Sequence, residues 1–218
     1  RIEIPRAVGR CDREDVDIGP PLLIHSVEFR KEGREDPSLG PRITRFSFPR
    51  NRFEFIEKDA HATMETMVDE PYVNHIPTRT GGVGHELLKR FYKYHFIPTQ
   101  PEDRENTLIS ETVGADTVVL EILARFTHDR IMDHMIPGIP PSGNKVELPV
   151  VVIASFRGDK LYNEHIYWDQ ASLLTQVGAL DPGDLPISGG IAAQKLENVS
   201  LPSNELMSNW HESEGKPL

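Results

Sequence analysis

The sequence predicts an α+β domain in which helices come first and a run of long antiparallel strands follows. Between residues 51 and 96 apolar residues recur at three- and four-residue spacing, which is typical of amphipathic helices. After Asn106 the period changes to two, which indicates strands with one buried face. With 218 residues, 38% of them apolar, the chain can bury one sizeable core.

The composition restricts the classes of partner. The formal net charge is -10, whereas proteins that bind nucleic acids or anionic membranes usually present a basic surface, so we expect neither partner. The sequence contains no run of 18 apolar residues and no signal-peptide pattern. Its single cysteine, Cys11, excludes an internal disulfide and fits a reducing compartment, so we expect a cytoplasmic location. Because the chain opens with Arg rather than Met, a trimmed targeting segment is the alternative.

The N-terminal half is predicted to contain an arm and two helices. Residues 1–50 mix proline, glycine and charge without a lasting period, and we interpret them as an extended arm that wraps the core or a partner subunit. For about the first 15 residues, a loosely ordered terminus is the alternative. Apolar spacing predicts a helix over residues 51–68, capped by Asn51, and a short strand over 71–76. A second helix is expected over residues 83–96. Its predicted inward face consists of Leu87, Leu88, Phe91 and Tyr94.

Two strands over residues 107–113 and 117–128 are predicted to pair through the turn Gly114-Ala115-Asp116. The second strand carries an apolar row that ends at His128 and faces the core, although a histidine at a strand end that faces solvent is the alternative. The loop 129–144 is rich in proline and glycine, and loops of this kind often border binding sites.

Most of the candidate chemistry lies on a hairpin over residues 145–169, whose turn is Arg157-Gly158-Asp159-Lys160. Alternation along its second strand puts one polar row on a single face of the sheet: Asn163, His165, Tyr167 and Asp169. Asp169 also precedes a short helix that reaches Gln176, so an N-cap is its more ordinary role. Short helices are expected near residues 191–197 and 204–210.

Several segments, taken in order, resemble the SnoaL-like polyketide cyclase family. They are Tyr72-Val73-Asn74-His75-Ile76-Pro77, the glycine-rich helix start after it, the loop 139–145, the turn 156–161 and the closing segment 168–178. The resemblance covers residues 52–180 and implies the cone-shaped barrel of the NTF2-like superfamily, a curved antiparallel sheet packed on N-terminal helices. The chain would then comprise an extended arm (1–50), an NTF2-like domain (51–180) and a C-terminal tail (181–218), and the tail resembles extensions on uncharacterised fungal members.

The resemblance also implies an apolar pocket inside the cone, a homodimer through the outer sheet, and no cofactor. Family cyclases close a ring by removing a proton from an activated carbon, and the aspartate of their Glu-His-Trp-Asp strand is the acid/base group. The matching residues here are Glu164-His165-Ile166-Tyr167, so the histidine is kept and Tyr167 replaces the aspartate. A phenol with a pKa of about 10 is a weak base, but it can donate a hydrogen bond to a carbonyl or enolate.

The predicted catalytic residues are His165, His75, Tyr167 and Asp169, and the predicted residues of the substrate pocket are Asn163 and His128. His165 is the first candidate because the resemblance turns its row toward the pocket; a structural histidine is the alternative. His75 is the candidate to replace the missing aspartate as base. Tyr167 would orient a ligand carbonyl, and Asp169 would be a displaced acid/base group.

Other kinds of site find less support in the sequence. The nine histidines show no local metal-binding spacing, so no metal is expected, and a site assembled from His75, His128 and His165 is the remaining alternative. No serine-hydrolase elbow, phosphate loop or dinucleotide fingerprint occurs. Glu164 is expected to face away from the pocket, where it would pair with Arg125 or join a dimer interface.

The predicted function is a cofactor-independent lyase, isomerase or cyclase that acts by acid-base chemistry on a small, largely apolar carbonyl compound of polyketide type. The alternative is a non-catalytic protein of the same fold that binds a ligand or a partner chain, and Tyr167 at the aspartate position favours it. An open pocket lined by His75 and His165 would support the enzyme. A cone plugged by side chains or by the arm would support the interaction protein.

Overall fold

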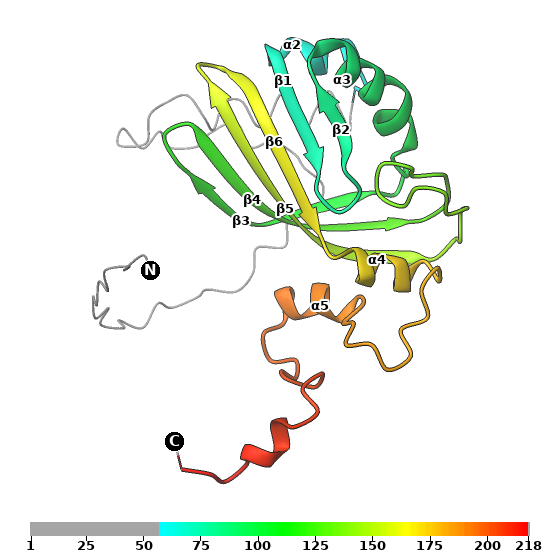
Figure 1. Cartoon of the computed structure of the whole chain (residues 1–218), viewed down its shortest axis with the longest axis vertical. Helices are drawn as coiled ribbons and strands as arrows, with labels where there is room; N and C mark the ends of the chain where they lie inside the picture. The colour runs from blue at the N-terminus through cyan, green and yellow to red at the C-terminus, as the bar shows by residue number, and fades with distance from the viewer. Residues whose placement is uncertain (1–56, 218) are drawn as a thin grey trace, which may run out of the picture.

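The computed structural model describes residues 57–217, and its main feature is a curved sheet of six strands in the order β2-β1-β6-β5-β4-β3 (Figure 1). β1 and β6 pair in parallel, and the other neighbours pair antiparallel. The predicted α+β class is therefore confirmed. The strands are β1 (Met67–His75), β2 (Thr80–Val83), β3 (Glu105–Val113), β4 (Thr117–Thr127), β5 (Lys145–Arg157) and β6 (Lys160–Trp168).

Helices cover the β1–β2 end of the sheet (Figure 1). α2 (Ala60–Glu65) begins at Asp59, whose carboxylate accepts hydrogen bonds from the first backbone N–H groups of the helix. α3 (His85–Phe91) continues into a π-helical turn, η2 (Tyr92–Phe96), and a 3₁₀ turn, η3 (Ile97–Thr99). After the sheet follow α4 (Gln170–Gln176), α5 (Ile191–Glu197) and η4 (Trp210–Ser213). No helix of the described part is long and apolar enough to span a bilayer.

The hydrophobic core lies between the inner face of the sheet and the segments α2, α3, η2, η3 and α4. It includes Val73, Leu88, Phe91, Tyr92, Phe96, Phe126, Leu148, Ile166, Trp168 and Leu173. The loop 129–144 adds Met132, Met135 and Ile136, which are all at most 3% exposed. Full burial of one such side chain stabilises the fold by about 1.5–3 kcal/mol, so this loop is part of the packed interior.

The first predicted helix is shorter than expected, because α2 ends at Glu65 and β1 already begins at Met67. The predicted cap Asn51 and the arm predicted for residues 1–50 lie outside the described residues. β2 was not predicted. Two of its four residues are glycine, which is depleted in strands and gives no alternating pattern of polar and apolar side chains.

The inward face predicted for the second helix is only partly correct. Leu88 and Phe91 are buried, but Leu87 is 56% exposed and Tyr94 is 59% exposed. The π-helical turn adds residues to the helical repeat after Phe91, and Tyr92 therefore takes the inward position that Tyr94 was expected to hold. Leu87 lies beside the inward stripe rather than on it.

The segment after the sheet folds back with α5, as predicted for residues 191–197. Ala193 is fully buried, and α5 packs on the face of the sheet opposite the core. The helix expected over 204–210 is wrong, because that segment forms turns and η4 starts only at Trp210.

The expected pairing of Glu164 with Arg125 is also wrong. Arg125 binds Glu147 and Glu197 instead. The strand register explains this choice of partner. Glu147 of β5 lies directly opposite Arg125 of β4, whereas Glu164 of β6 lies opposite Ala154 of β5.

Candidate functional site

His75, the last residue of β1, lies in an aromatic enclosure at the inner face of the sheet. Its side chain is 5% exposed. The rings of Phe91, Phe96 and Trp168 have their centroids 5.6, 5.8 and 5.7 Å from the centroid of the His75 ring. The parallel pairing of β1 with β6 places Ile166 beside His75, and this register turns Ile166 and Trp168 toward the same interior.

A backbone carbonyl fixes the proton of His75. The Nδ1 atom of His75 lies 3.2 Å from the carbonyl oxygen of Thr80, the residue opposite it in the β1–β2 pair. A carbonyl oxygen only accepts, so Nδ1 carries the proton of the neutral ring and Nε2 carries the basic lone pair. In this tautomer the Thr80 carbonyl sets which nitrogen of the His75 ring carries the proton.

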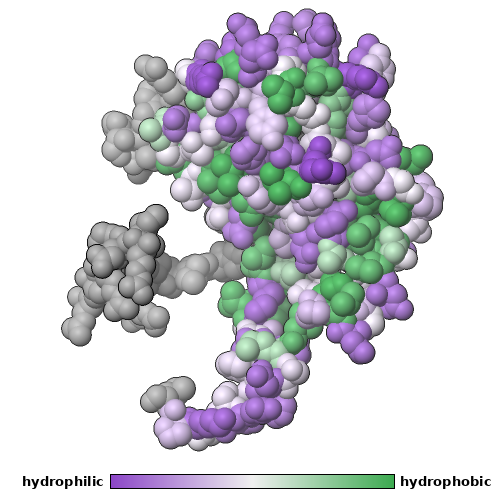
Figure 2. All heavy atoms as spheres, viewed as in Figure 1, coloured by the Kyte–Doolittle hydropathy of each residue, from purple (hydrophilic) through white to green (hydrophobic). Residues whose placement is uncertain are grey.

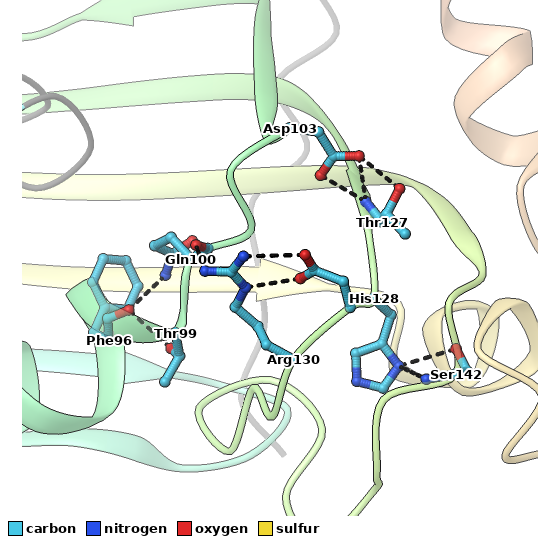
Figure 3. A network of polar contacts seen from close by, with 9 residues as sticks. Phe96, Thr99, Gln100, Asp103, Thr127, His128, Arg130 and Ser142 are labelled. Atoms are coloured by element: carbon cyan, nitrogen blue, oxygen red, sulfur yellow. Dashed lines mark hydrogen bonds and ion pairs between the residues drawn. The ribbon is translucent and has the colours of Figure 1, made fainter.

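A second buried histidine, His134, contacts His75 edge to face, with ring centroids 5.9 Å apart. Its Nδ1 lies 3.2 Å from the Thr99 hydroxyl, and its Nε2 lies 3.4 Å from the side-chain amide of Gln100. The Thr99 hydroxyl donates to the carbonyl of Phe96 (Figure 3) and therefore accepts from Nδ1 of His134. Both ring nitrogens of His134 are thus occupied by neighbouring side chains.

Polar contacts tie this histidine pair to its surroundings. The hydroxyls of Thr78 and Thr80 each donate to the His134 carbonyl over 2.8 Å, which joins β2 to the loop 129–144. Arg104 donates to the side-chain oxygen of Gln100 over 2.8 Å, and Arg130 donates to the backbone carbonyl of Gln100 over 3.2 Å. These contacts hold the loop against the interior.

The pKa of His134 lies well below the ordinary value, first because burial disfavours the charged ring and then because His75 and Arg104 repel a positive charge there. His134 was not predicted from the sequence. The only available signal is that it falls in a loop expected to border the site.

We expect the free energy of unfolding to decrease as the pH falls below about 6.5, the ordinary histidine pKa. Below this pH His134 is protonated in the unfolded chain but stays neutral in the folded chain. The free energy of unfolding therefore decreases until the pH reaches the lower pKa that His134 has in the folded chain. Urea unfolding between about pH 5 and pH 8 measures this slope. His134→Gln should make the slope shallower than in the wild type, and an unchanged slope would contradict the assignment.

His128 follows the inner row of β4 and is fully buried, so the alternative that it faces solvent is wrong. The backbone N–H of Ser142 donates to its Nδ1 over 3.3 Å (Figure 3), which leaves the proton on Nε2. Nε2 has no hydrogen-bond partner among the described residues. Burial lowers the pKa of His128, while the charge of Asp129 acts in the opposite direction. Its role in a substrate pocket stays a prediction.

His165 and Tyr167 lie on the other face of the sheet. They alternate along β6 with Ile166 and Trp168, which belong to the core, and Tyr167 is 39% exposed. The prediction that the row of Asn163, His165 and Tyr167 faces the interior is therefore wrong. Alternation identifies residues that share a face, but the pairing of β6 with β1 decides which face is inward.

A metal site assembled from His75, His128 and His165 is excluded by the same orientation. The ring of His165 packs edge-on against Tyr72, with centroids 5.5 Å apart, on the face opposite His75. Within residues 57–217 no group of three or more histidine, cysteine, aspartate or glutamate side chains could hold a metal ion.

Asp169 is the N-cap of α4, which confirms its more ordinary predicted role. Its carboxylate accepts hydrogen bonds from the backbone N–H groups of Ala171 and Ser172 over 2.9 and 3.3 Å. It also accepts from the Ser172 hydroxyl over 2.6 Å. With these three hydrogen bonds, the Asp169 carboxylate serves to cap the first turn of α4.

Asp169→Ala should lower the free energy of unfolding by about 1 kcal/mol, because the first turn of α4 loses its cap. Asp169→Asn should change the free energy of unfolding by only a few tenths of 1 kcal/mol, since asparagine caps helices about as well as aspartate. Urea unfolding of both variants checks this. An equal loss in the two would mean that the negative charge, rather than the cap, stabilises this position.

One hollow of the described part lies beside the start of α2 and the outer side of α3. It has a volume of about 600 Å³ and is lined by residues 57–61 with Lys89, Lys93 and Ile97. Neither His75 nor His165 is among its lining residues.

The fold is similar to that of several known structures. A candidate SnoaL-like polyketide cyclase from Jannaschia sp. CCS1 matches with a TM-score of 0.50 and 20% sequence identity, over 69% of this chain and 99% of that chain. TsrD from Streptomyces laurentii matches with a TM-score of 0.48 and 19% identity, over 60% and 91% of the two chains. A candidate polyketide cyclase from Acidithiobacillus ferrooxidans matches with a TM-score of 0.47 and 20% identity, over 59% and 88%.

No protein-family model and no curated protein matches the chain. At 20% identity the likeness to the Jannaschia protein concerns the fold alone. This likeness confirms the fold that was predicted from the sequence motifs, that of SnoaL-like polyketide cyclases.

Proposed function

We propose that this chain is a cofactor-independent enzyme that removes a proton from a carbon next to a carbonyl group, in a lyase, isomerase or cyclase reaction. The observation that carries the proposal is His75, whose Nδ1 lies 3.2 Å from the Thr80 carbonyl and whose ring is enclosed by aromatic side chains. A neutral imidazole of this kind is a suitable base near neutral pH. The description of the Jannaschia protein as a candidate polyketide cyclase is in keeping with this class of reaction.

The enclosure also indicates the kind of substrate. Phe91, Phe96 and Trp168 offer apolar ring surfaces, so the molecule that reaches His75 is small and largely apolar. His134 supports the base by packing against it. Tyr167 and Asp169 receive no chemical role, because the first lies on the outer face and the second caps α4.

A second candidate function is binding without catalysis. The side chains of Met132, Met135 and Ile136 fill part of the interior, and a plugged cone suits an interaction protein better than an enzyme. The two candidates differ in whether a proton leaves carbon.

Deuterium exchange at carbon tests the proposal without knowledge of the natural substrate. Small cyclic and aryl ketones, such as 2-tetralone and 2-methylcyclohexanone, are incubated with the protein in D₂O, and NMR follows deuterium uptake next to the carbonyl. We expect faster uptake than with an equal concentration of free imidazole, because the enclosure holds the ketone against the base. Uptake no faster than with imidazole for the whole set would favour the non-catalytic candidate.

A further inference from the structure

An exposed apolar surface with a basic border lies on the outer side of α3. Leu87 lies on α3, Tyr94 lies on the π-helical turn η2 that continues it, and Val83 lies just before α3. Their exposed fractions are 56%, 59% and 58%. We call this surface the α3 patch, and it consists of Val83, Leu87, Lys89, Arg90, Lys93 and Tyr94. The Lys93 ammonium lies 5.1 Å from the centroid of the Tyr94 ring, so charge and apolar surface are in direct contact.

The chain after α5 has the opposite character. Residues 202–217, which we call the tail arm, leave the body of the protein as a narrow extension (Figures 1 and 2). Leu206, Met207 and Trp210 are 54%, 50% and 53% exposed. Backbone hydrogen bonds in the arm close local turns, such as Met207 to Asn204 and Trp210 to Met207. The acidic residues of the arm are Glu205, Glu212 and Glu214.

The two surfaces complement each other in charge as well as in polarity. On α3 and η2 the three basic residues of the α3 patch outnumber one exposed acid, Glu86, and in the tail arm three glutamates outnumber one lysine, Lys216. The whole chain carries a net charge of -10, so a basic patch is an exception on its surface and attracts an acidic segment. Scattered exposed apolar residues are ordinary, but two sets with opposite charges are the expected halves of one interface.

The α3 patch and the tail arm lie at opposite ends of the long axis of the molecule (Figure 1). The arm of a chain therefore cannot reach its own α3 patch without unpacking from the body, and a second copy must supply the partner surface.

We propose that the tail arm of one copy docks on the α3 patch of a second copy. Trp210 and Met207 would pack over Leu87 and Tyr94, and the glutamates of the arm would face Lys89, Arg90 and Lys93. If the second copy returns the contact, a closed two-fold dimer results, and if it does not, an open chain forms. This contact differs from a dimer through the outer sheet and is independent of the proposed catalytic function.

Sedimentation velocity of the full chain tests the proposal. Trp210→Ala in the arm and Leu87→Ser in the patch should each weaken self-association at least about tenfold, because buried aromatic and apolar anchors carry most of the energy of an interface. Both side chains are exposed in the single chain, so circular dichroism should show an unchanged fold. Added salt should also weaken association.

Charge exchange and competition identify the two surfaces. Lys93→Glu and Glu212→Lys should each weaken association, and the double variant should restore it in part, since the pair is re-formed with its signs reversed. A synthetic peptide of residues 202–217 added to the wild-type chain should dissociate the assembly.

Tyr167→Ser is the matched control, because it removes an exposed aromatic side chain from the outer sheet and should leave association unchanged. A wild-type chain that stays monomeric at all concentrations would overturn the proposal. So would association that is lost in Tyr167→Ser but retained in Trp210→Ala, since this result would place the interface on the outer sheet.

Discussion

His75→Gln lowers the rate of deuterium uptake at carbon at least about a hundredfold, whereas His165→Gln leaves it unchanged: this is the expected result of the proposed chemistry. Glutamine keeps most of the volume of the side chain and an N–H that can donate to the Thr80 carbonyl. It has no basic lone pair, so only the proton transfer is lost. His165 has the same chemistry but lies on the opposite face of the sheet, against Tyr72.

The two variants serve as controls for each other. Urea unfolding should give both a midpoint near that of the wild type, which separates loss of the base from loss of the fold. A large loss in His165→Gln with none in His75→Gln would return the active base to the outer row. Equal losses at unchanged stability would mean that neither face alone contains the reacting group.

The hairpin of β5 and β6 could be predicted because its determinants are local. Two long alternating segments flank a turn with Gly158 and Asp159, and both strands and turn lie where the pattern indicates. The cap of α4 at Asp169 is local in the same sense. Each of these features depends on residues close together in the chain.

The face of β6 could not be predicted from the residues of β6. Its two rows, one with His165 and Tyr167 and the other with Ile166 and Trp168, both contain large aromatic side chains. The inward row is selected by the parallel pairing with β1 and by the contact of Trp168 with His75, almost a hundred residues earlier in the chain. The family resemblance predicted the position of this strand in the sequence correctly, but it assigned the inward face to the wrong row of side chains.

Two other parts of the site were hidden for different reasons. A π-helical turn changes which residues face inward, and the spacing of apolar residues in the sequence does not reveal such a turn. For this reason Tyr92 was not predicted to be buried, and Tyr94 was wrongly predicted to be. His134 comes from a loop without a repeat. It is held by contacts to Thr80 of β2 and Thr99 of η3 that only the folded chain creates.

The largest effect on stability is expected for Gly81→Ala, at the strand pair that positions His75. Gly81 has φ of 124°, and a Cβ atom there would lie 2.1 Å from the backbone carbonyl oxygen of Val73. Backbone strain alone costs of order 1–3 kcal/mol, and relief of the clash must move β2 away from β1, so we expect a loss of at least about 3 kcal/mol. Urea unfolding measures it.

Gly158→Ala is the matched control for this substitution. Gly158 also has a positive φ, of 65°, but a Cβ atom there would meet nothing within 4 Å. Its loss should be about 1 kcal/mol, so the difference between the two variants measures the close approach of β2 to β1. Because Thr80 adjoins Gly81 and fixes the proton of His75, Gly81→Ala should also slow deuterium uptake even in the fraction of molecules that remains folded. Equal effects of the two substitutions on stability and uptake would show that β2 does not hold the base in place.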